Sequence, residues 1–353
     1  MRKIFLQHIR TALLRWYATQ KRDLPWRRKI SFYRVWVSEI ILQQTQVKQG
    51  ITYFETFISI FPDFNSLAEA EEKDILRIWQ GLGYYSRAIN MHKAAKQIVK
   101  NLNNTPPETF EEIKKLKGIG DYTAAAISSI VYNEPHAVVD GNVFRVLSRF
   151  FSDATPINTS VGKKHFTDLA YLILDKAHPG DFNQAIMELG ALVCKPKDPF
   201  CESCPIKIWC KGYLEWQKFP VKKRKIKKRT RYFNYIIIKD GNNILFHQRD
   251  NQDIYKKMYE PLLIETDKPQ TSDKLINILR KTYIKNAKNL VELYDYKKHN
   301  LTHQTIFYKT LVLQNNSFDI TLLKSFGYFM ISLHEVSKYP QSNIVRDILK
   351  DVI

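Results

Sequence analysis

The sequence predicts a mainly α-helical region followed by a small α+β domain. Three observations support this division. Two helix-forming segments flank Gly118-Ile119-Gly120, and all four cysteines of the 353-residue chain lie in Cys194–Cys210. After a basic run that ends at Arg231, the hydrophobic period changes from helical to alternating. The expected boundaries are a helical region at 1–216, a basic linker at 217–231 and the second domain at 232–353.

The glycine pair Gly118-Ile119-Gly120 lies between two predicted helices. Thr109-Phe110-Glu111-Glu112 is a capping box that opens the first helix, and Asp121 begins the second. Glycines permit a sharp turn and a close approach to the backbone, and free N–H groups at a helix N-terminus attract phosphate. The segment therefore looks like a helix-hairpin-helix motif that binds DNA. An ordinary helix–helix turn with a glycine C-cap is the alternative.

Asp140 precedes another predicted helix, because Asp140-Gly141-Asn142 leads into an amphipathic run from Val143 to Phe150. A carboxylate at a helix N-terminus is stabilised as the anion by the helix dipole and the free amides. Asp140 is therefore either a charged reactive group or only an N-cap.

The helix expected at Tyr33–Gln44 carries apolar side chains around its whole circumference, with Glu39 in the middle. Burial raises the pKa of a carboxyl group, so Glu39 is a candidate general acid. A core glutamate paired with an arginine is the other interpretation.

Composition favours a nucleic-acid partner. The chain has 55 Lys and Arg against 35 Asp and Glu, a net charge of +20. Such an excess attracts polyanions, whether DNA, RNA or an acidic membrane surface. No apolar stretch is long enough to span a bilayer and the N-terminus has no cleavage site, so we expect a soluble, intracellular protein.

Two further segments have open interpretations. After an opening helix that ends near Trp16, the segment Asp23-Leu24-Pro25-Trp26-Arg27-Arg28 is expected to be a loop. It is either a solvated turn or a clamp for a base. Gly81-Leu82-Gly83-Tyr84-Tyr85-Ser86-Arg87 either closes an ordinary turn or pushes an apolar wedge into a duplex. The phenylalanines at Phe54–Phe64 are expected in the core.

The cysteines are spaced by six, two and five residues from Cys194 to Cys210. Clustered thiols in an intracellular chain indicate a metal site rather than disulfides. Zinc accepts four thiolates but usually uses two close pairs, whereas a single close pair is present here. Uneven spacing with Pro205 after the third cysteine is typical of an iron-sulfur loop.

The C-terminal part is expected to begin after a solvated linker whose basic residues, Lys222 to Arg231, also cross phosphates. The sequence predicts the following elements: a hairpin of Tyr235–Ile238 with Ile244–Phe246, strands at Leu290–Tyr296 and Ile306–Val312, and helices at Ser272–Tyr283 and Gln341–Asp351.

These motifs together resemble the MutY family of adenine DNA glycosylases, within the endonuclease III and helix-hairpin-helix superfamily. The motifs that carry the resemblance are Leu24-Pro25-Trp26, Ser38-Glu39, Leu42–Val47, Gly81–Tyr85, the hairpin, Asp140–Val143 and the cysteine loop. The resemblance implies a six-helix part at about 27–133 and an iron-sulfur part formed by about 1–26 and 134–216. It also implies a Nudix-like C-terminal domain that recognises the oxidised base without hydrolysing nucleotides.

The resemblance assigns roles to individual residues. Glu39 would protonate adenine at N7, Asp140 would stabilise or transiently bond the sugar carbon, and Tyr122 and Asn142 would orient them. The other implied sites are a base pocket of Trp26, Arg27 and Gln184; DNA contacts at Gln44, Thr45, Leu82, Tyr84, Gly118, Ile119 and Gly120; 8-oxoguanine recognition by Thr302 and His303; and a 4Fe-4S cluster on Cys194, Cys201, Cys204 and Cys210. In the recognition loop, Leu301 replaces the aromatic ring of the family's Phe-Ser-His.

The expected function is removal of adenine opposite 8-oxoguanine or guanine in duplex DNA, without strand cleavage, by a cytoplasmic monomer that is nucleoid-associated if bacterial. A bifunctional endonuclease III-like glycosylase and lyase is one alternative, although it needs a lysine where this chain has Tyr122. A non-catalytic DNA-binding module is the other, although it would not need both Glu39 and Asp140.

Overall fold

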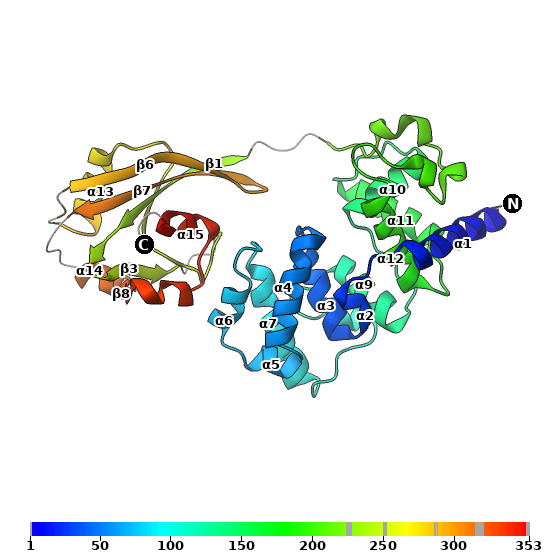
Figure 1. Cartoon of the computed structure of the whole chain (residues 1–353), viewed down its shortest axis with the longest axis horizontal. Coiled ribbons are helices and arrows are strands. Elements are labelled where there is room, and N and C mark those ends of the chain that lie inside the picture. The colour runs from blue at the N-terminus through cyan, green and yellow to red at the C-terminus, as the bar shows by residue number, and fades with distance from the viewer. Residues whose placement is uncertain are drawn as a thin grey trace. The chain divides into compact units, whose positions relative to one another are not determined.

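The computed structural model describes residues 2–223, 228–249, 253–285, 287, 289–314 and 321–350. The chain divides into two compact units, one made of Met1–Glu69 and Asn90–Lys225, the other of Ala70–Ile89 and Ile226–Ile353. The first unit is helical and the second contains the strands (Figure 1). Within the described part of the chain, no helix is both long and apolar enough to cross a membrane.

The first unit is built from helices joined by short loops, and α12 is central because it contacts α1, α9 and α10. Its elements are α1 (Arg2–Gln20), α2 (Pro25–Arg28), α3 (Phe32–Leu42), α4 (Val47–Ile60), α5 (Phe64–Glu69), most of α7 (Ser86–Asn101), α8 (Phe110–Ile113), α9 (Asp121–Tyr132), α10 (Gly141–Phe151), α11 (Ser160–Ile173), α12 (Pro179–Leu192), η1 (Cys201–Ser203), η2 (Lys207–Trp209) and η3 (Tyr213–Lys218). Glycines permit the close packing of α12: a Cβ on Gly190 would lie 2.6 Å from the Asn142 Cβ.

The N-terminal helix α1 packs with α10, α11 and α12 around one apolar core. Ile9 and Leu13 of α1 are buried in it. The Arg10 guanidinium also donates to the carbonyls of Ile173 at 3.0 Å and Leu172 at 3.2 Å. The cysteine loop packs against this core through Cys194, Cys204 and Cys210. The first residues of the chain therefore form one layer with residues more than 160 positions later.

The second unit combines two sheets with short helices. Its elements are α6 (Glu72–Ile78), β1 (Arg229–Ile237), β2 (Lys239–Asp240), β3 (Asn243–Gln248), β4 (Tyr259–Glu260), β5 (Leu262–Thr266), α13 (Ser272–Thr282), β6 (Asn289–Asn300), β7 (Gln304–Gln314), α14 (Thr321–Ser325), β8 (Phe329–Ser332), η4 (Leu333–Lys338) and α15 (Asn343–Lys350). One sheet has the order β5-β1-β7-β6, with β1 parallel to β7, and the other joins β2, β3, β4 and β8. The predicted α+β composition is confirmed.

Strand β1 lies between two helical layers. Alternate side chains of a strand point to opposite faces of its sheet. Ile236 packs in a core with Leu275 of α13, whereas Tyr235 and Ile237 pack in another with Ile348 of α15. Figure 1 shows β1, β6 and β7 side by side in this unit. The continuous apolar run of β1 therefore reflects a strand that is covered on both faces.

Two sequence-based expectations for the second unit were wrong in part. The turn at Asp240-Gly241-Asn242 joins the short strand β2 to β3, but Tyr235–Ile237 pairs with β5 and β7 rather than with β3. The basic run is not solvated to its end: Arg231 is buried in β1 and donates to Glu265. Arg224, Lys225 and Lys227 lie outside the described residues.

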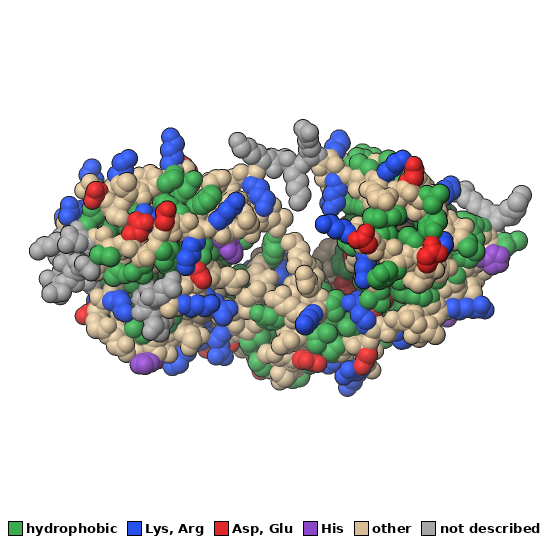
Figure 2. All heavy atoms as spheres, turned by 45° about the horizontal axis from the view of Figure 1, so that its top comes forward, with side chains coloured by type: hydrophobic (Ala, Val, Ile, Leu, Met, Phe, Trp, Pro, Cys, Tyr) green, Lys and Arg blue, Asp and Glu red, His purple; other side chains and the backbone are tan. Residues whose placement is uncertain are grey.

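The segment expected to be a loop at Asp23–Arg28 contains the short helix α2. Pro25 occupies its first turn, where the missing N–H has no helical partner to lose, so proline begins this helix instead of breaking it. Lys and Arg side chains are spread over the face of the molecule shown in Figure 2, as the net charge suggests.

Candidate active site

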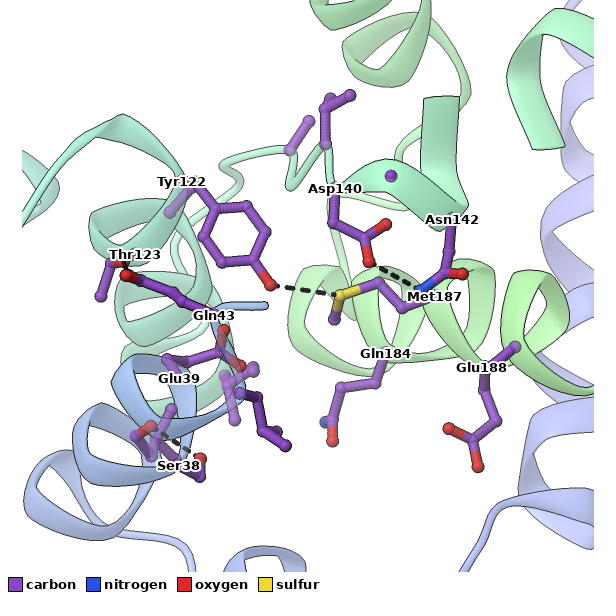
Figure 3. A pocket seen from close by; sticks show the side chains of 18 of the residues that line it. Ser38, Glu39, Gln43, Tyr122, Thr123, Asp140, Asn142, Gln184, Met187 and Glu188 are labelled. Carbon is purple, nitrogen blue, oxygen red and sulfur yellow. Dashed lines mark hydrogen bonds between the residues drawn. The ribbon is translucent and has the colours of Figure 1, made fainter. Parts of the chain in front are cut away.

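A cavity of about 1010 Å³ opens in the first unit, between α2 and α3 on one side and α9, α10 and α12 on the other. It brings together residues that are far apart in the sequence (Figure 3). The predicted site residues that line it are Trp26, Arg27, Glu39, Gln44, Thr45, Gly120, Tyr122, Asp140, Asn142 and Gln184. Gly118 and Ile119 of the hairpin are not part of its lining.

Glu39 faces the cavity from α3, among buried neighbours of the same helix. The pKa of this carboxyl is raised to about 7, chiefly by burial and to a smaller extent by the charge of Asp140, while a hydrogen bond from Tyr122 opposes the rise. Near neutral pH a large fraction of Glu39 is therefore protonated, as a general acid requires.

Asp140 is the N-cap of α10. Its Oδ1 accepts from the Val143 amide at 2.7 Å, and its Oδ2 accepts from the Asn142 Nδ2 at 2.8 Å. Burial nevertheless raises the pKa of Asp140, and these hydrogen bonds only partly lower it. The expectation that the helix terminus sets its ionisation missed this larger effect.

Asn142 has a fixed orientation. The Arg145 Nη2 donates to the Asn142 Oδ1 at 2.9 Å. Because a guanidinium only donates, the amide oxygen faces Arg145 and the amide nitrogen is left to bind Asp140.

Tyr122 projects from α9 toward the same space, and its hydroxyl lies 3.8 Å from the Met187 sulfur (Figure 3). Burial, with the charges of Glu39 and Asp140, raises the pKa of this phenol well above its ordinary value. Tyr122 therefore remains a neutral hydrogen-bond donor between the two carboxyl groups.

The predicted base pocket is supported by charged residues that the sequence did not single out. The Arg27 Nε donates to the Gln184 Oε1 at 3.0 Å, and the Arg27 Nη2 donates to Glu188 at 3.1 Å. The cavity residues missing from the sequence-based set include Arg22, Gln43, Thr123, Met187 and Glu188. Glu188 lies one helical turn after Gln184, and this spacing is the signal that would have found it.

The predicted DNA contacts lie in turns. Gln44 is exposed just after α3 with a left-handed φ of 64°. Gly118 has a φ of 81° in the hairpin, and Gly120 is the N-cap of α9. Ile119 is buried, and its backbone N–H donates to the Leu116 carbonyl at 3.1 Å.

Leu82, Tyr84, Thr302 and His303 belong to the second unit. The Tyr84 side chain is exposed, and Arg87 holds its loop by donating to the Gly83 carbonyl at 3.1 Å. Thr302 and His303 are exposed between β6 and β7. The hydroxyls of Tyr84 and Thr302 are hydrogen-bonded to each other within this unit.

All four cysteines are free thiols that line one small cavity of about 30 Å³ beside Arg149. Burial raises the pKa of Cys204 to about 12 and that of Cys210 to about 11. Within the described ranges, no three His, Cys, Asp or Glu side chains are grouped to hold a single metal ion.

Comparison with known proteins first defines the class. Residues 37–167 match the family described as HhH-GPD superfamily base excision DNA repair protein. A thermostable thymine-DNA glycosylase superposes with a TM-score of 0.54 at 26% identity, covering 61% of this chain and 97% of that one. An endonuclease III structure, at 19% identity and a TM-score of 0.51, has the same fold. The protein is a helix-hairpin-helix DNA glycosylase.

Curated relatives narrow the class to one family. The chain is 34% identical over 325 residues to the adenine DNA glycosylase of Buchnera aphidicola subsp. Baizongia pistaciae, covering 87% of this chain and 86% of that protein. It is 42% identical over 212 residues to the adenine DNA glycosylase of Homo sapiens, covering 58% of this chain and 39% of that protein. The chain belongs to the adenine DNA glycosylase family. These glycosylase relatives indicate that its partner is DNA.

Proposed function

We propose that the protein removes adenine mispaired with 8-oxoguanine or guanine in duplex DNA, as a monofunctional glycosylase of base excision repair. The observation that carries this proposal is the pair of carboxyl groups, Glu39 and Asp140, that line one cavity in different environments. Cleavage of an N-glycosidic bond needs an acid for the leaving base and an anion for the developing sugar charge, as glycoside hydrolysis does.

The reaction begins when adenine leaves the stack and enters the cavity, because its glycosidic bond is inaccessible in the duplex. Glu39 gives its proton to adenine N7. The bond between the sugar C1′ and adenine N9 then breaks, and its electron pair leaves with the neutral base. Asp140 stabilises the sugar cation, or bonds to C1′ transiently and is displaced when water arrives. Water then adds to C1′ and gives its proton to the Glu39 carboxylate, which leaves an abasic site.

Tyr122 supports the monofunctional assignment. A lyase needs an amine that forms a Schiff base with the sugar. The Tyr122 phenol stays neutral beside Glu39 and Asp140 and has no such chemistry. The strand that carries the abasic site therefore remains intact until alkali cleaves it.

The cysteine loop fits a 4Fe-4S cluster, which would be held by Cys194, Cys201, Cys204 and Cys210. In such a cluster each thiolate binds its own iron, so the four sulfurs need not surround one ion. Buried thiols with raised pKa values are costly to ionise without a metal, and bound iron removes this cost. The cluster would supply structural stabilisation to the loop that carries Lys195 and Lys207.

The remaining site residues are proposed to contact DNA. Gln44, Thr45, Leu82 and Tyr84 would hold the opposite strand and the hairpin Gly118-Ile119-Gly120 a phosphate, while Thr302 and His303 would read 8-oxoguanine. We propose that the protein acts as a monomer in the cytoplasm.

The test is a duplex that carries adenine opposite 8-oxoguanine. Free adenine should be released, and strand breaks should appear only after alkali. Glu39→Gln and Asp140→Asn should each abolish excision while duplex affinity stays nearly unchanged, because neither removes a phosphate contact. Asp168→Asn, an exposed change on α11 outside the lining of the cavity, is the matched control. Excision by either variant at the wild-type rate would refute the proposed roles.

Borohydride trapping tests the bifunctional alternative. Wild-type protein should not be trapped, whereas Tyr122→Lys should slow excision and allow some covalent trapping, since the new amine would face the sugar near Asp140. Efficient trapping and strand cleavage by the unmodified protein would overturn the monofunctional assignment.

A further inference from the structure

Glu188 is a buried charge beside the base pocket. Its side chain is 2% exposed, and it accepts from the Arg22 Nε and Nη2 at 2.8 Å each and from the Arg22 backbone N–H at 2.9 Å. Although burial raises the pKa of Glu188, the hydrogen bonds from Arg22 and Arg27 lower it to about 2. Glu188 is therefore ionised throughout the working pH range.

The Glu188 carboxylate fixes Arg27 in one position. The Arg27 Nη2 donates to Glu188 at 3.1 Å, and its Nη1 donates to the Arg22 carbonyl at 3.1 Å. The guanidinium also lies 5.5 Å from the centre of the Tyr17 ring. These contacts leave the Arg27 Nε pointing at Gln184, to which it donates at 3.0 Å.

This contact decides which way the Gln184 amide faces. A guanidinium has donors only, so the Gln184 atom that it contacts is the oxygen. The amide nitrogen is then the end left for the cavity that Gln184 lines. Gln184 and Glu188 extend from the same helix, and Gln184 lines the same cavity as Glu39 (Figure 3). Among the described residues, the amide nitrogen has no hydrogen-bond partner.

We propose that Glu188 is a positioning residue: through Arg27 it orients the Gln184 amide so that its NH₂ group donates to an unprotonated ring nitrogen of the bound base. The inference rests on the proposed excision of adenine. It adds that, in one contact with the base, the protein donates the hydrogen bond and the base accepts it. Adenine carries acceptors at N1 and N3. Guanine has a hydrogen on N1, so a donor facing that position opposes guanine.

The experiment compares adenine with 1-deazaadenine and 3-deazaadenine, each opposite 8-oxoguanine, under single-turnover conditions. Each analogue replaces one ring acceptor by C–H. The analogue that lacks the contacted nitrogen loses one hydrogen bond. Wild-type protein should therefore excise it roughly tenfold more slowly than it excises the other analogue, and this difference is the extra penalty. That extra penalty should nearly vanish in Gln184→Leu, which removes the donor, and in Glu188→Gln, which releases Arg27.

The variant-by-analogue design cancels the intrinsic reactivity of each analogue. Asp23→Asn is the matched control, because it breaks the exposed Arg28–Asp23 pair next to the same short helix and does not touch Gln184. It should keep the wild-type penalty. Circular dichroism checks folding, and Glu188→Asp replaces Glu188→Gln if the latter does not fold, since it keeps the charge but shortens the reach to Arg27.

A Glu188 variant that retains the full penalty while Gln184→Leu loses it would refute the positioning role. Wild-type protein with no extra penalty on either analogue would refute the ring-nitrogen contact. If wild-type protein released no adenine at all, the proposed function would fail instead, so the two failures are distinguishable.

Discussion

Glu39 and Tyr122 each alter the proton affinity of the other. Burial raises the pKa of Glu39 to about 7, and the Tyr122 hydrogen bond keeps it from rising further. The same proximity raises the pKa of Tyr122, since a second negative charge beside Glu39 is unfavourable. The pKa of Glu39 is thus kept near 7 by Tyr122, which stays neutral at this pH.

This pairing predicts the pH dependence of excision. The acid must be protonated, so the single-turnover rate should fall as pH rises through about 7. Tyr122→Phe removes the hydrogen bond that lowers the pKa of Glu39, and the alkaline limb should therefore move to higher pH even if the maximum rate drops. Tyr132→Phe on the same helix is the control, with an unmoved limb. An alkaline limb that stays in place in Tyr122→Phe would contradict the assignment of Glu39 as the acid.

Sequence alone singled out the two carboxyl groups proposed for the chemistry, and it missed the residues that pack beside the base pocket. Glu39 and Asp140 are conspicuous because an acid in an apolar helix or before a helix needs an explanation. The Arg22–Glu188 pair spans 166 residues, so no local pattern connects its two members. Only the packing of α12 against α1 brings the segments together.

At the scale of elements, the hairpin before α9 requires a glycine both for its backbone conformation and for lack of space. Gly118 has a φ of 81°, and an added Cβ would lie 2.6 Å from the Asn90 Cβ. Gly118→Ala should destabilise the protein by about 1 to 3 kcal/mol, through backbone strain and this clash, and should weaken DNA binding. Gly141→Ala, at a helical position with no atom within 4 Å of the new Cβ, should leave the melting temperature nearly unchanged. Equal melting temperatures for the two variants would contradict the strain argument.

The expected helices are confirmed where their periodicity is strong, as at Tyr33–Gln44 and Ser272–Tyr283. The errors come from segments whose local pattern has two outcomes. Proline can either break a helix or begin one, and Pro25 begins α2. The apolar run at Tyr235–Ile238 looks like one arm of a hairpin. Its partners in the structure are Leu262 and Thr310, which only tertiary packing selects. Strand pairing was therefore the part of the fold that sequence predicted least well.

The cysteine loop yields a prediction about metal content. Protein purified without oxygen should be yellow-brown and contain about four irons per chain, as a 4Fe-4S cluster requires. Cys204→Ser should lower iron content, yield and DNA affinity together, because the loop carries basic residues. Ser203→Ala, an exposed neighbour, should keep the iron. Stoichiometric zinc without iron would refute the cluster.

At the scale of the whole molecule, two units contribute to one proposed specificity. Thr302 is exposed in the second unit, between β6 and β7. Thr302→Ala should reduce the preference for adenine opposite 8-oxoguanine over adenine opposite guanine, since one hydrogen bond to a base edge is worth roughly 1 to 3 kcal/mol. Thr230→Ala, exposed on β1, is the control. Competition between the two duplexes measures the preference, and an unchanged ratio would remove Thr302 from the recognition site.

The packing of α1 also has a consequence for biosynthesis. The Arg10 side chain binds the carbonyl of Ile173, which is 163 residues further along the chain. At ribosomal rates that separation takes roughly 8 to 30 seconds to translate. During this interval Ile9, Leu13 and Tyr17 have no native partners on α10, α11 or α12 to cover them. Helix α1 is thus synthesised well before the helices that bury it, and its apolar face must avoid misassociation until α12 has left the ribosome.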